Sequence, residues 1–299
     1  MELWILATLA AATFQTARFM LHKRLAVGLG ATASTFARFV YAAPLAALSL
    51  ALYLAATGAA LPRLGDGFWL WAVIGGAGQI LATVFTVLLF ARRSFAIGIA
   101  LKKTEVLQTA ALGFVLLGEA ISGLGWIAIA IGMAGVLLMT EPPKGGDAKG
   151  SLQDPKVILL GMAAGLFFAL AGIGYRGATL AVESDSALLR AGMSLVIVTA
   201  LQSTAMAIWL RWREPGQISA TWAARRGAIW LGLTSALGSW CWFTAFTLQN
   251  AALVYAVGQV ELILSVAASV LFFRERVTAR ELSGIALLGV SILVLILGV

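Results

Sequence analysis

The chain has 299 residues, of which 61% are hydrophobic and 11% are charged, and its mean hydropathy is +0.96. This composition leaves too little polar surface for a water-soluble domain, so we expect the chain to lie in a lipid bilayer. The net charge of +8 does not indicate a nucleic-acid-binding protein, because the basic residues are concentrated in the connections between apolar segments.

Ten apolar stretches are long enough to cross the hydrocarbon core as helices, for which about 20 residues are needed. The short alternating segments of a membrane β-barrel are absent from the sequence. We therefore predict an all-α membrane protein with ten transmembrane helices, at residues 3–21, 32–56, 68–91, 95–117, 122–140, 157–175, 188–210, 227–248, 251–273 and 282–299.

The two halves of the chain align as a duplicated unit. Charged residues of the first half recur in the second at offsets of 156 residues (Glu105 with Glu261, Glu119 with Glu275) and 152 residues (Arg24 with Arg176, Arg38 with Arg190). Because each half holds five spans, the second repeat must run through the membrane inverted. Inverted repeats around a central cavity are characteristic of secondary transporters. We expect one membrane transport domain over residues 1–299, with repeats at 1–145 and 150–299.

The basic residues predict the orientation of the chain. When the connections are assigned alternately to two sides, fourteen Lys and Arg residues fall on one side. The other side holds Arg63 and, at its margin, Arg176 and Arg190. Cytoplasmic loops carry the excess of Lys and Arg, so we predict a multi-pass protein with both termini outside.

Several kinds of site are missing from the sequence. One histidine and one cysteine, Cys241, cannot supply a metal-ligand cluster or an internal disulfide. The chain has neither a P-loop nor a nucleophile and base paired within one helical turn. We therefore expect no enzyme activity, no cofactor, and transport driven by a gradient. The expected partners are the bilayer and a small-molecule substrate but no nucleic acid, with a monomer as the expected state.

Two glutamates, Glu105 and Glu261, lie near the middle of the fourth and ninth predicted spans. An ionised group there costs at least about 2.5 to 3.5 kcal/mol, so it persists only when paired, protonated or facing water. Lys102 shares a helical face with Glu105 and can neutralise it. Glu261 has no basic residue within one turn. We expect Lys102 or Lys103 to reach Glu261 across the repeat interface, or Glu261 to face substrate; a purely structural ion pair is the alternative.

Other charged residues lie at the ends of predicted spans. Glu119 and Glu275 occupy interfacial depth at the far ends of the fourth and ninth helices. We expect them to anchor helix ends by accepting hydrogen bonds from backbone donors of the adjoining turn, with a gating role as the alternative. His22, beside Lys23 and Arg24, is expected at the membrane interface, with a proton relay as the alternative.

Polar residues of the first and third spans recur at helical spacing, which turns them toward protein or water and away from lipid. The two stripes are Thr8, Gln15 and His22 in the first span, and Gly75, Gln79, Thr83 and Thr86 in the third. Hydrogen bonding between helices and binding of a substrate are both compatible with this pattern.

The eighth and ninth spans carry candidate substrate contacts of the second half. Trp240 and Trp242 lie deep in the eighth span, and Tyr255 and Gln259 are one turn apart in the ninth. Aromatic surfaces with a few polar anchors suit a substrate that has an aromatic or flat apolar body. Packing in the protein core is the alternative role for these side chains.

The duplicated five-span units, the glutamates of the fourth and ninth helices, and Arg38 and Arg190 near the start of the second and seventh helices resemble the drug/metabolite transporter superfamily, specifically its ten-span EamA-type members. The resemblance covers essentially the whole chain, and the aromatic-rich central helices are most similar to the aromatic amino-acid exporter branch. It implies a carrier of the bacterial inner membrane with a basket of helices around a central cavity. It also implies cytoplasmic termini, against the charge distribution, and we keep the orientation that the charges predict.

The chain departs from that family in its fourth and ninth helices, which often carry a proline near their start. Neither helix has one here. Gly98 and Gly258 are the expected sources of flexibility instead.

Together these features predict a secondary transporter that exports aromatic or other neutral amino acids and related metabolites by alternating access. Lys102, Glu105 and Glu261 would hold the carboxylate and amine of the substrate or sense protons. A multidrug or other metabolite exporter of the same fold and a channel are the alternatives. The predicted substrate-binding residues are Gln15, Gln79, Thr83, Lys102, Glu105, Trp240, Trp242, Tyr255, Gln259 and Glu261.

Overall fold

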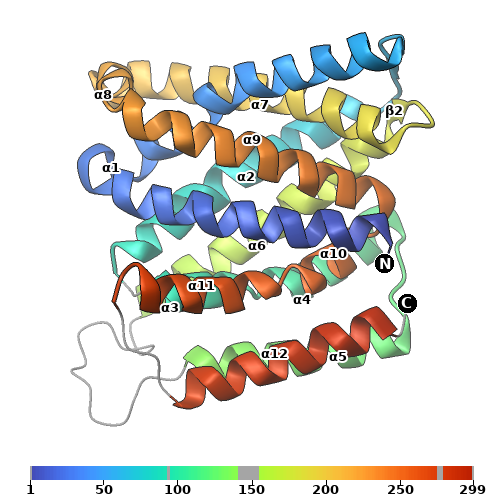
Figure 1. The fold of residues 1–299 in the computed structure, drawn as a ribbon, viewed down its shortest axis with the longest axis vertical. Helices are drawn as coiled ribbons and strands as arrows, with labels where there is room; N and C mark the ends of the chain where they lie inside the picture. The colour runs from blue at the N-terminus through green and yellow to red at the C-terminus, as the bar shows by residue number, and fades with distance from the viewer. Residues whose placement is uncertain (1, 93–94, 141–154, 275–278, 298–299) are drawn as a thin grey trace.

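The computed structural model describes residues 2–92, 95–140, 155–274 and 279–297. The long helices of this part run along a common direction and form a bundle (Figure 1). The elements are α1 (Leu3–Thr57), β1 (Arg63–Leu64), α2 (Phe68–Phe90), α3 (Phe95–Lys102), α4 (Glu105–Leu117), α5 (Gly123–Thr140), α6 (Pro155–Leu180), β2 (Val182–Glu183), α7 (Ala187–Arg213), α8 (Gln217–Ala223), α9 (Arg225–Leu248), α10 (Ala251–Val257), α11 (Val260–Leu271) and α12 (Ala279–Leu297).

The long element α1 consists of two arms. Gly30 interrupts it with φ 73° and ψ 179°, a backbone conformation that residues with a Cβ rarely adopt. The first arm carries one polar stripe of the sequence and the second arm carries Arg38. The break at Gly30 therefore lets one element contribute to the centre of the bundle twice.

The fourth and ninth predicted spans are each broken into two helices. Lys103 and Thr104 form a turn between α3 and α4, and Gly258 and Gln259 form a turn between α10 and α11. Gly258 therefore lies at a break. The expected flexible point at Gly98 is wrong, because this residue lies inside α3 and the chain turns where its lysines meet the carboxylates described below.

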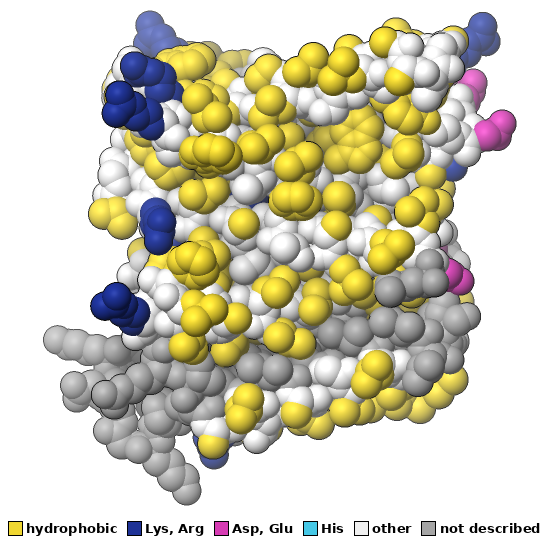
Figure 2. Space-filling model, in the orientation of Figure 1, with side chains coloured by type: hydrophobic (Ala, Val, Ile, Leu, Met, Phe, Trp, Pro, Cys, Tyr) yellow, Lys and Arg dark blue, Asp and Glu magenta, His cyan; other side chains and the backbone are white. Residues whose placement is uncertain are grey.

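The outside of the bundle suits a lipid environment. Large hydrophobic side chains cover much of the visible face (Figure 2), and Val27 and Leu271 are 90% and 74% exposed. Five helical segments of the described chain are long and apolar enough to cross a membrane, namely Leu3–Thr57, Phe68–Phe90, Leu159–Leu180, Ala187–Arg213 and Ala251–Leu271. The architecture fits the predicted all-α membrane protein, whereas the number of ten crossings stays a prediction.

Close packing of helices brings the polar stripes inside. A Cβ on Gly174 of α6 would collide with the backbone of Gly75 in α2, and one on Gly78 would lie 2.8 Å from the carbonyl oxygen of Phe167. Small residues permit helices to approach in this way. The stripes are buried as predicted, with Thr8, Gln15, His22, Gln79, Thr83 and Thr86 all at most 6% exposed.

The two ends of the bundle differ in charge. Most visible Lys and Arg side chains gather at one end, and the visible Asp and Glu side chains gather at the other (Figure 2). Helix α1 begins and α12 ends at the acidic end (Figure 1). At this end β1 and β2 pair antiparallel, with Arg63 opposite Glu183. The all-α prediction did not include this sheet, because two-residue strands leave no periodic signal in a sequence.

Candidate functional site

The centre of the bundle holds four ionisable side chains from the two broken helices. The Nζ of Lys103 lies 3.1 Å from Glu105 Oε1 and 2.8 Å from Glu261 Oε2. The Nζ of Lys102 lies 3.1 Å from Glu261 Oε2 and 3.6 Å from Glu105 Oε1. All four side chains are fully buried, so their charges are balanced within the network and not by water. The predicted contact with Glu261 is confirmed, and both lysines make it.

The breaks in the helices explain why the carboxylates sit at this depth. Glu105 begins α4, and Glu261 lies in the first turn of α11. The first turn of a helix has unpaired N–H groups and the positive end of the helix dipole, which favour a negative charge. Each half-helix therefore supports its carboxylate from one side, and the lysines support it from the other.

Gln15 of α1 extends the network toward the eighth predicted span. Its Nε2 donates to Glu261 Oε2 over 3.0 Å, and its Oε1 accepts from Trp242 Nε1 at 3.0 Å and from Arg18 Nη2 at 2.5 Å. One amide thus joins a carboxylate, an indole and a guanidinium. These contacts fix which way the amide points, because its carbonyl oxygen must face the two donors.

Arg38, on the second arm of α1, joins the polar stripe of α2. Its Nη1 donates to Thr83 Oγ1 over 2.7 Å, and Gln79 Nε2 also lies 3.2 Å from this hydroxyl. The Arg38 side chain is 3% exposed. The predicted residues Gln79 and Thr83 therefore meet a buried arginine, which sequence reasoning did not assign to the site.

A small closed cavity lies beside these groups and is walled mainly by aromatic rings. Its volume is about 10 Å³, and it is lined by Gln15, Arg38, Gln79, Phe168, Tyr175, Ser239, Trp242, Phe243, Phe246 and Tyr255. The ring of Trp242 lies 5.5 Å from the rings of both Phe246 and Tyr255. The Tyr255 hydroxyl donates to the carbonyl of Phe168. We refer to this space as the central cavity.

Two of the predicted substrate contacts lie elsewhere. Trp240 abuts Gly192 of α7, on a different side of α9 from Trp242. The side-chain amide of Gln259 lies against Gly132 of α5, which the hydroxyl of Ser291 in α12 also approaches, and the amide finds no hydrogen-bond partner among the described residues. Neither side chain lines the central cavity, because the helical rotation between Trp240 and Trp242 and the turn at Gln259 carry them to other faces.

The positions of the basic residues in the sequence could have identified Arg18 and Arg38, which were not predicted as site residues. Of 21 Lys and Arg residues, the connections between predicted spans account for all but five. The structure buries the side chains of four of these, Arg18, Arg38, Lys102 and Lys103, and leaves Arg190 at the start of α7 partly exposed. Intramembrane basic residues are functional candidates by default, and Arg18 escaped notice because it lies close to the predicted end of the first span.

His22 is more enclosed than expected. The sequence predicts it at the membrane interface, and its side chain is fully buried by protein, with no hydrogen-bond partner for either ring nitrogen among the described residues. Its ring lies 6.2 Å from that of Phe19. Its depth at the interface stays a prediction.

Glu119 has a different partner from the one predicted. Its carboxylate forms an ion pair with Arg176 of α6, which also donates to the carbonyl oxygens of Phe246 and Gln249 over 2.7 Å each. The arginine thereby ties α6 to the end of α9. The corresponding prediction for Glu275 lies outside the described residues.

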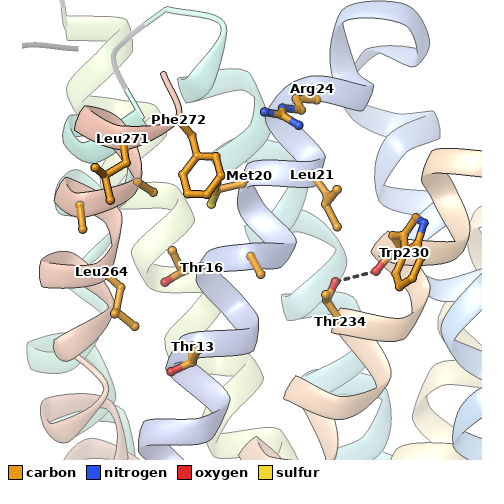
Figure 3. A pocket seen from close by; sticks show the side chains of 13 residues that line it. Thr13, Thr16, Met20, Leu21, Arg24, Trp230, Thr234, Leu264, Leu271 and Phe272 are labelled. Atoms are coloured by element: carbon orange, nitrogen blue, oxygen red, sulfur yellow. Dashed lines mark hydrogen bonds between the residues drawn. The ribbon is translucent and has the colours of Figure 1, made fainter. Parts of the chain in front are cut away.

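A larger hollow opens on the outer surface between α1, α9 and α11 (Figure 3). Its volume is about 530 Å³, and side chains such as Met20, Leu264 and Phe272 line it, with Arg24 at one end. None of the predicted substrate-binding residues lines it. Because its walls are mostly apolar and it lies apart from the Lys–Glu network, this hollow is not the candidate site.

Comparisons with known proteins agree with this arrangement. Residues 155–297 match the sequence model of the EamA-like transporter family. This match supports the drug/metabolite transporter superfamily and a membrane transporter of that type. No curated protein matches the chain. One solved crystal structure aligns over 99% of this chain and 94% of its own length with a TM-score of 0.69 and 16% identity, which shows a shared fold alone.

Proposed function

We propose that the protein is a secondary transporter that exports aromatic or other neutral amino acids and related metabolites by alternating access. One observation carries this proposal: two broken helices deliver Lys102, Lys103, Glu105 and Glu261 to one buried network beside an aromatic cavity. Discontinuous helices form the substrate and ion sites of many secondary transporters. The match of residues 155–297 to the EamA-like family supports the same function.

The proposal includes ten crossings arranged as two inverted repeats. The two arms of α1, the joined pairs α3–α4 and α10–α11, and the remaining long helices supply ten rods at the places that the sequence predicts. The two broken rods occupy equivalent places, with Glu105 and Glu261 each in the first turn after the break. Two related units that meet at a shared network can open it first to one side and then to the other.

Each part of the site has a proposed role in holding an amino acid. The aromatic walls, Trp242 and Tyr255 among them, contact a flat apolar body. Arg38, Gln15, Gln79 and Thr83 offer hydrogen bonds to the polar end. The Lys–Glu network lies next to Gln15 and changes its pairing when the site opens. Arg38 joins the residues named from the sequence, and Trp240 and Gln259 take packing roles.

The described conformation is a closed one. A cavity of about 10 Å³ holds no more than about one water molecule, so an amino acid enters only after the helices separate. The ring contacts of Trp242 with Phe246 and Tyr255 are the ones that separate on opening. A channel, in contrast, needs a continuous aqueous path, and the central cavity does not provide one in this state.

The proposed location is the bacterial inner membrane, with both termini outside and the protein acting as a monomer. The distribution of charge over the bundle supports this orientation. The first residues of α1 and the last residues of α12 lie at the end of the bundle opposite most of the visible Lys and Arg side chains (Figures 1 and 2). Positive residues remain on the cytoplasmic side during insertion.

Counterflow in liposomes tests the proposed function. Vesicles that contain the purified protein are preloaded with one unlabelled compound, and the uptake of the same labelled compound is measured over a panel of amino acids, aromatic metabolites and drugs. We expect saturable counterflow with aromatic amino acids or their relatives. Counterflow with drugs alone would favour a multidrug exporter, and uptake without saturation or counterflow would indicate a channel.

A further inference from the structure

The buried charges at the centre of the bundle do not balance. Among the described residues, the fully or almost fully buried Lys, Arg, Asp, Glu and His side chains are four cations (Arg18, Arg38, Lys102, Lys103) and two carboxylates (Glu105, Glu261), together with His22. With the histidine neutral, this leaves two positive charges in excess. The remaining described carboxylates whose side chains have a determined exposure lie at least partly exposed, so they do not neutralise this excess.

The excess belongs to the arginines. Both lysines lie within 3.1 Å of a carboxylate, so the Lys–Glu network is neutral as a unit. Arg18, by contrast, donates only to the neutral amide of Gln15, and its Nε and Nη1 have no partner. Arg38 donates to the hydroxyl of Thr83, and its Nε has no partner. Neither guanidinium forms an ion pair with a described residue.

The unpaired arginines lie at or next to the central cavity. Arg38 lines it directly, and Arg18 is bonded to Gln15, which lines it as well. The rings of Trp242, Phe246 and Tyr255 also line it. A buried guanidinium without an anion is unfavourable, and it is relieved by a ligand that brings negative charge and hydrogen-bond acceptors. The rings meanwhile suit an apolar body.

We infer that the transported substrate is an organic anion with an aromatic or flat apolar body, whose carboxylate is bound by Arg38 and Arg18. The inference rests on the proposed transport function and narrows its substrate class to the related metabolites that carry a net negative charge, in place of the neutral amino acids. A zwitterionic amino acid brings no net charge and leaves the excess unchanged, whereas a monocarboxylate removes one positive charge and a dicarboxylate removes both. The free carboxylate oxygens of Glu105 and Glu261 are the groups that the ammonium of an amino acid would use. Ligands that differ only in the ammonium group therefore separate an amino-acid substrate from an organic anion.

Three matched probes make the comparison. L-phenylalanine and 3-phenylpropionate share the aromatic body and carboxylate and differ in the ammonium group, and benzylmalonate adds a second carboxylate. Each is titrated into the detergent-purified protein, and the concentration that raises the thermal midpoint half-maximally is recorded, because a ligand of the folded form stabilises it. We expect phenylpropionate to act at a concentration at least about 10-fold lower than phenylalanine, and benzylmalonate lower still.

Variants assign the effect to the arginines. Arg38→Gln and Arg18→Gln each remove one unpaired buried cation, so we expect the ligand-free thermal midpoint to stay unchanged or rise while the response to phenylpropionate is lost. Arg190→Gln is the matched control. Arg190 corresponds to Arg38 in the second repeat but bonds to the carbonyls of Leu180 and Val182. It should retain the full ligand response.

The outcomes separate this inference from the proposed function. Stronger stabilisation by phenylalanine than by either anion, or an anion response unchanged in both arginine variants, overturns the inference, and so does the absence of any response to the three probes. Saturable counterflow of an amino acid in liposomes would leave the transporter standing in each of those cases. Failure of every compound in that panel would overturn the transport function itself.

Discussion

The ammonium group of Lys103 lies 2.8 Å from the carboxylate of Glu261, and this ion pair joins the two broken helices of the bundle. The same ammonium also contacts Glu105 at 3.1 Å and the carbonyl oxygen of Gly258 at 3.3 Å. One lysine thus bridges a carboxylate from each predicted repeat. The contact forms where the helical hydrogen bonding of both rods is interrupted, so the breaks in the backbone and the pairing of charges support one another.

Removal of one member of this network should destabilise the closed protein. Glu261→Gln leaves two buried lysines facing one carboxylate, and the loss of one partner of a buried ion pair costs about 3–5 kcal/mol. We expect a lower free energy of unfolding in a denaturant titration of the detergent-solubilised protein. In the double variant Glu261→Gln/Lys103→Met the loss should be smaller than the sum of the single losses.

The control for this test is Glu183→Gln. Glu183 is an exposed carboxylate, and substitutions of that kind change stability by about 0.5 kcal/mol or less. Equal effects of Glu261→Gln and Glu183→Gln would show that the buried pairing is not made.

The contact of α2 with α6 predicts a strong effect of one methyl group. Gly174→Ala places a Cβ against the backbone of Gly75, and such overpacking costs about 1–3 kcal/mol. We expect a lower thermal midpoint. Gly289→Ala is the matched helical control, because nothing lies within 4 Å of its added Cβ and alanine favours a helix by about 1 kcal/mol. A stable Gly174→Ala protein would refute the close helix contact.

Trp242 and Trp240 should differ in their effect on transport, although both lie in the same helix. Trp242→Phe retains a ring and loses the hydrogen bond to Gln15, so we expect KM to rise by about 10-fold or less, the equivalent of 0.5–1.5 kcal/mol. Trp242→Ala should raise it further. Trp240→Ala, on the side facing Gly192, should leave KM near the wild-type value. Initial rates of uptake into liposomes measure both, and an equal response of the two positions would place the cavity elsewhere.

Arg176 should matter for stability but not for substrate binding. Arg176→Gln loses the ion pair with Glu119 and the hydrogen bonds of the guanidinium to the carbonyls of Phe246 and Gln249. A hydrogen bond to a charged group stabilises a protein by about 1.5–3 kcal/mol. We expect a lower thermal midpoint with an unchanged KM. Arg213→Gln, at an exposed position over Trp209, is the control and should change neither. A raised KM in Arg176→Gln would show that the ion pair belongs to the transport site.

The sequence predicts those features of the fold and site that follow from the free energy of placing an unpaired charged or polar group in a bilayer. Buried carboxylates in a bilayer are too unfavourable to stay unpaired, so a contact of Lys102 or Lys103 with Glu261 could be predicted from the sequence, next to the alternative that Glu261 faces substrate. That both lysines make the contact is seen only in the structure. The burial of the polar stripes of α1 and α2 follows from the same reasoning, because lipid cannot accept their hydrogen bonds.

Other features depend on local geometry that a pattern of residues does not contain. The step of two residues along α9, a rotation of about 200°, decides that Trp242 and not Trp240 reaches the cavity. The turn at Gly258 and Gln259 carries the amide of Gln259 toward α5. His22 is predicted at a membrane border because it follows the first apolar stretch, next to Lys23 and Arg24. Its enclosure by protein depends on the helices that pack around α1, which the sequence pattern does not contain.

The central claim is that one cavity opens alternately to the two sides of the membrane, and the accessibility of Ser239, which lines this cavity, tests it most directly. In a Cys241→Ala background, Ser239→Cys is exposed to a membrane-impermeant maleimide added to either face of oriented vesicles. We predict labelling from each face separately, and protection from both faces by a compound that shows counterflow. Labelling from one face alone under all conditions, or labelling that the transported compound does not slow, would contradict the account.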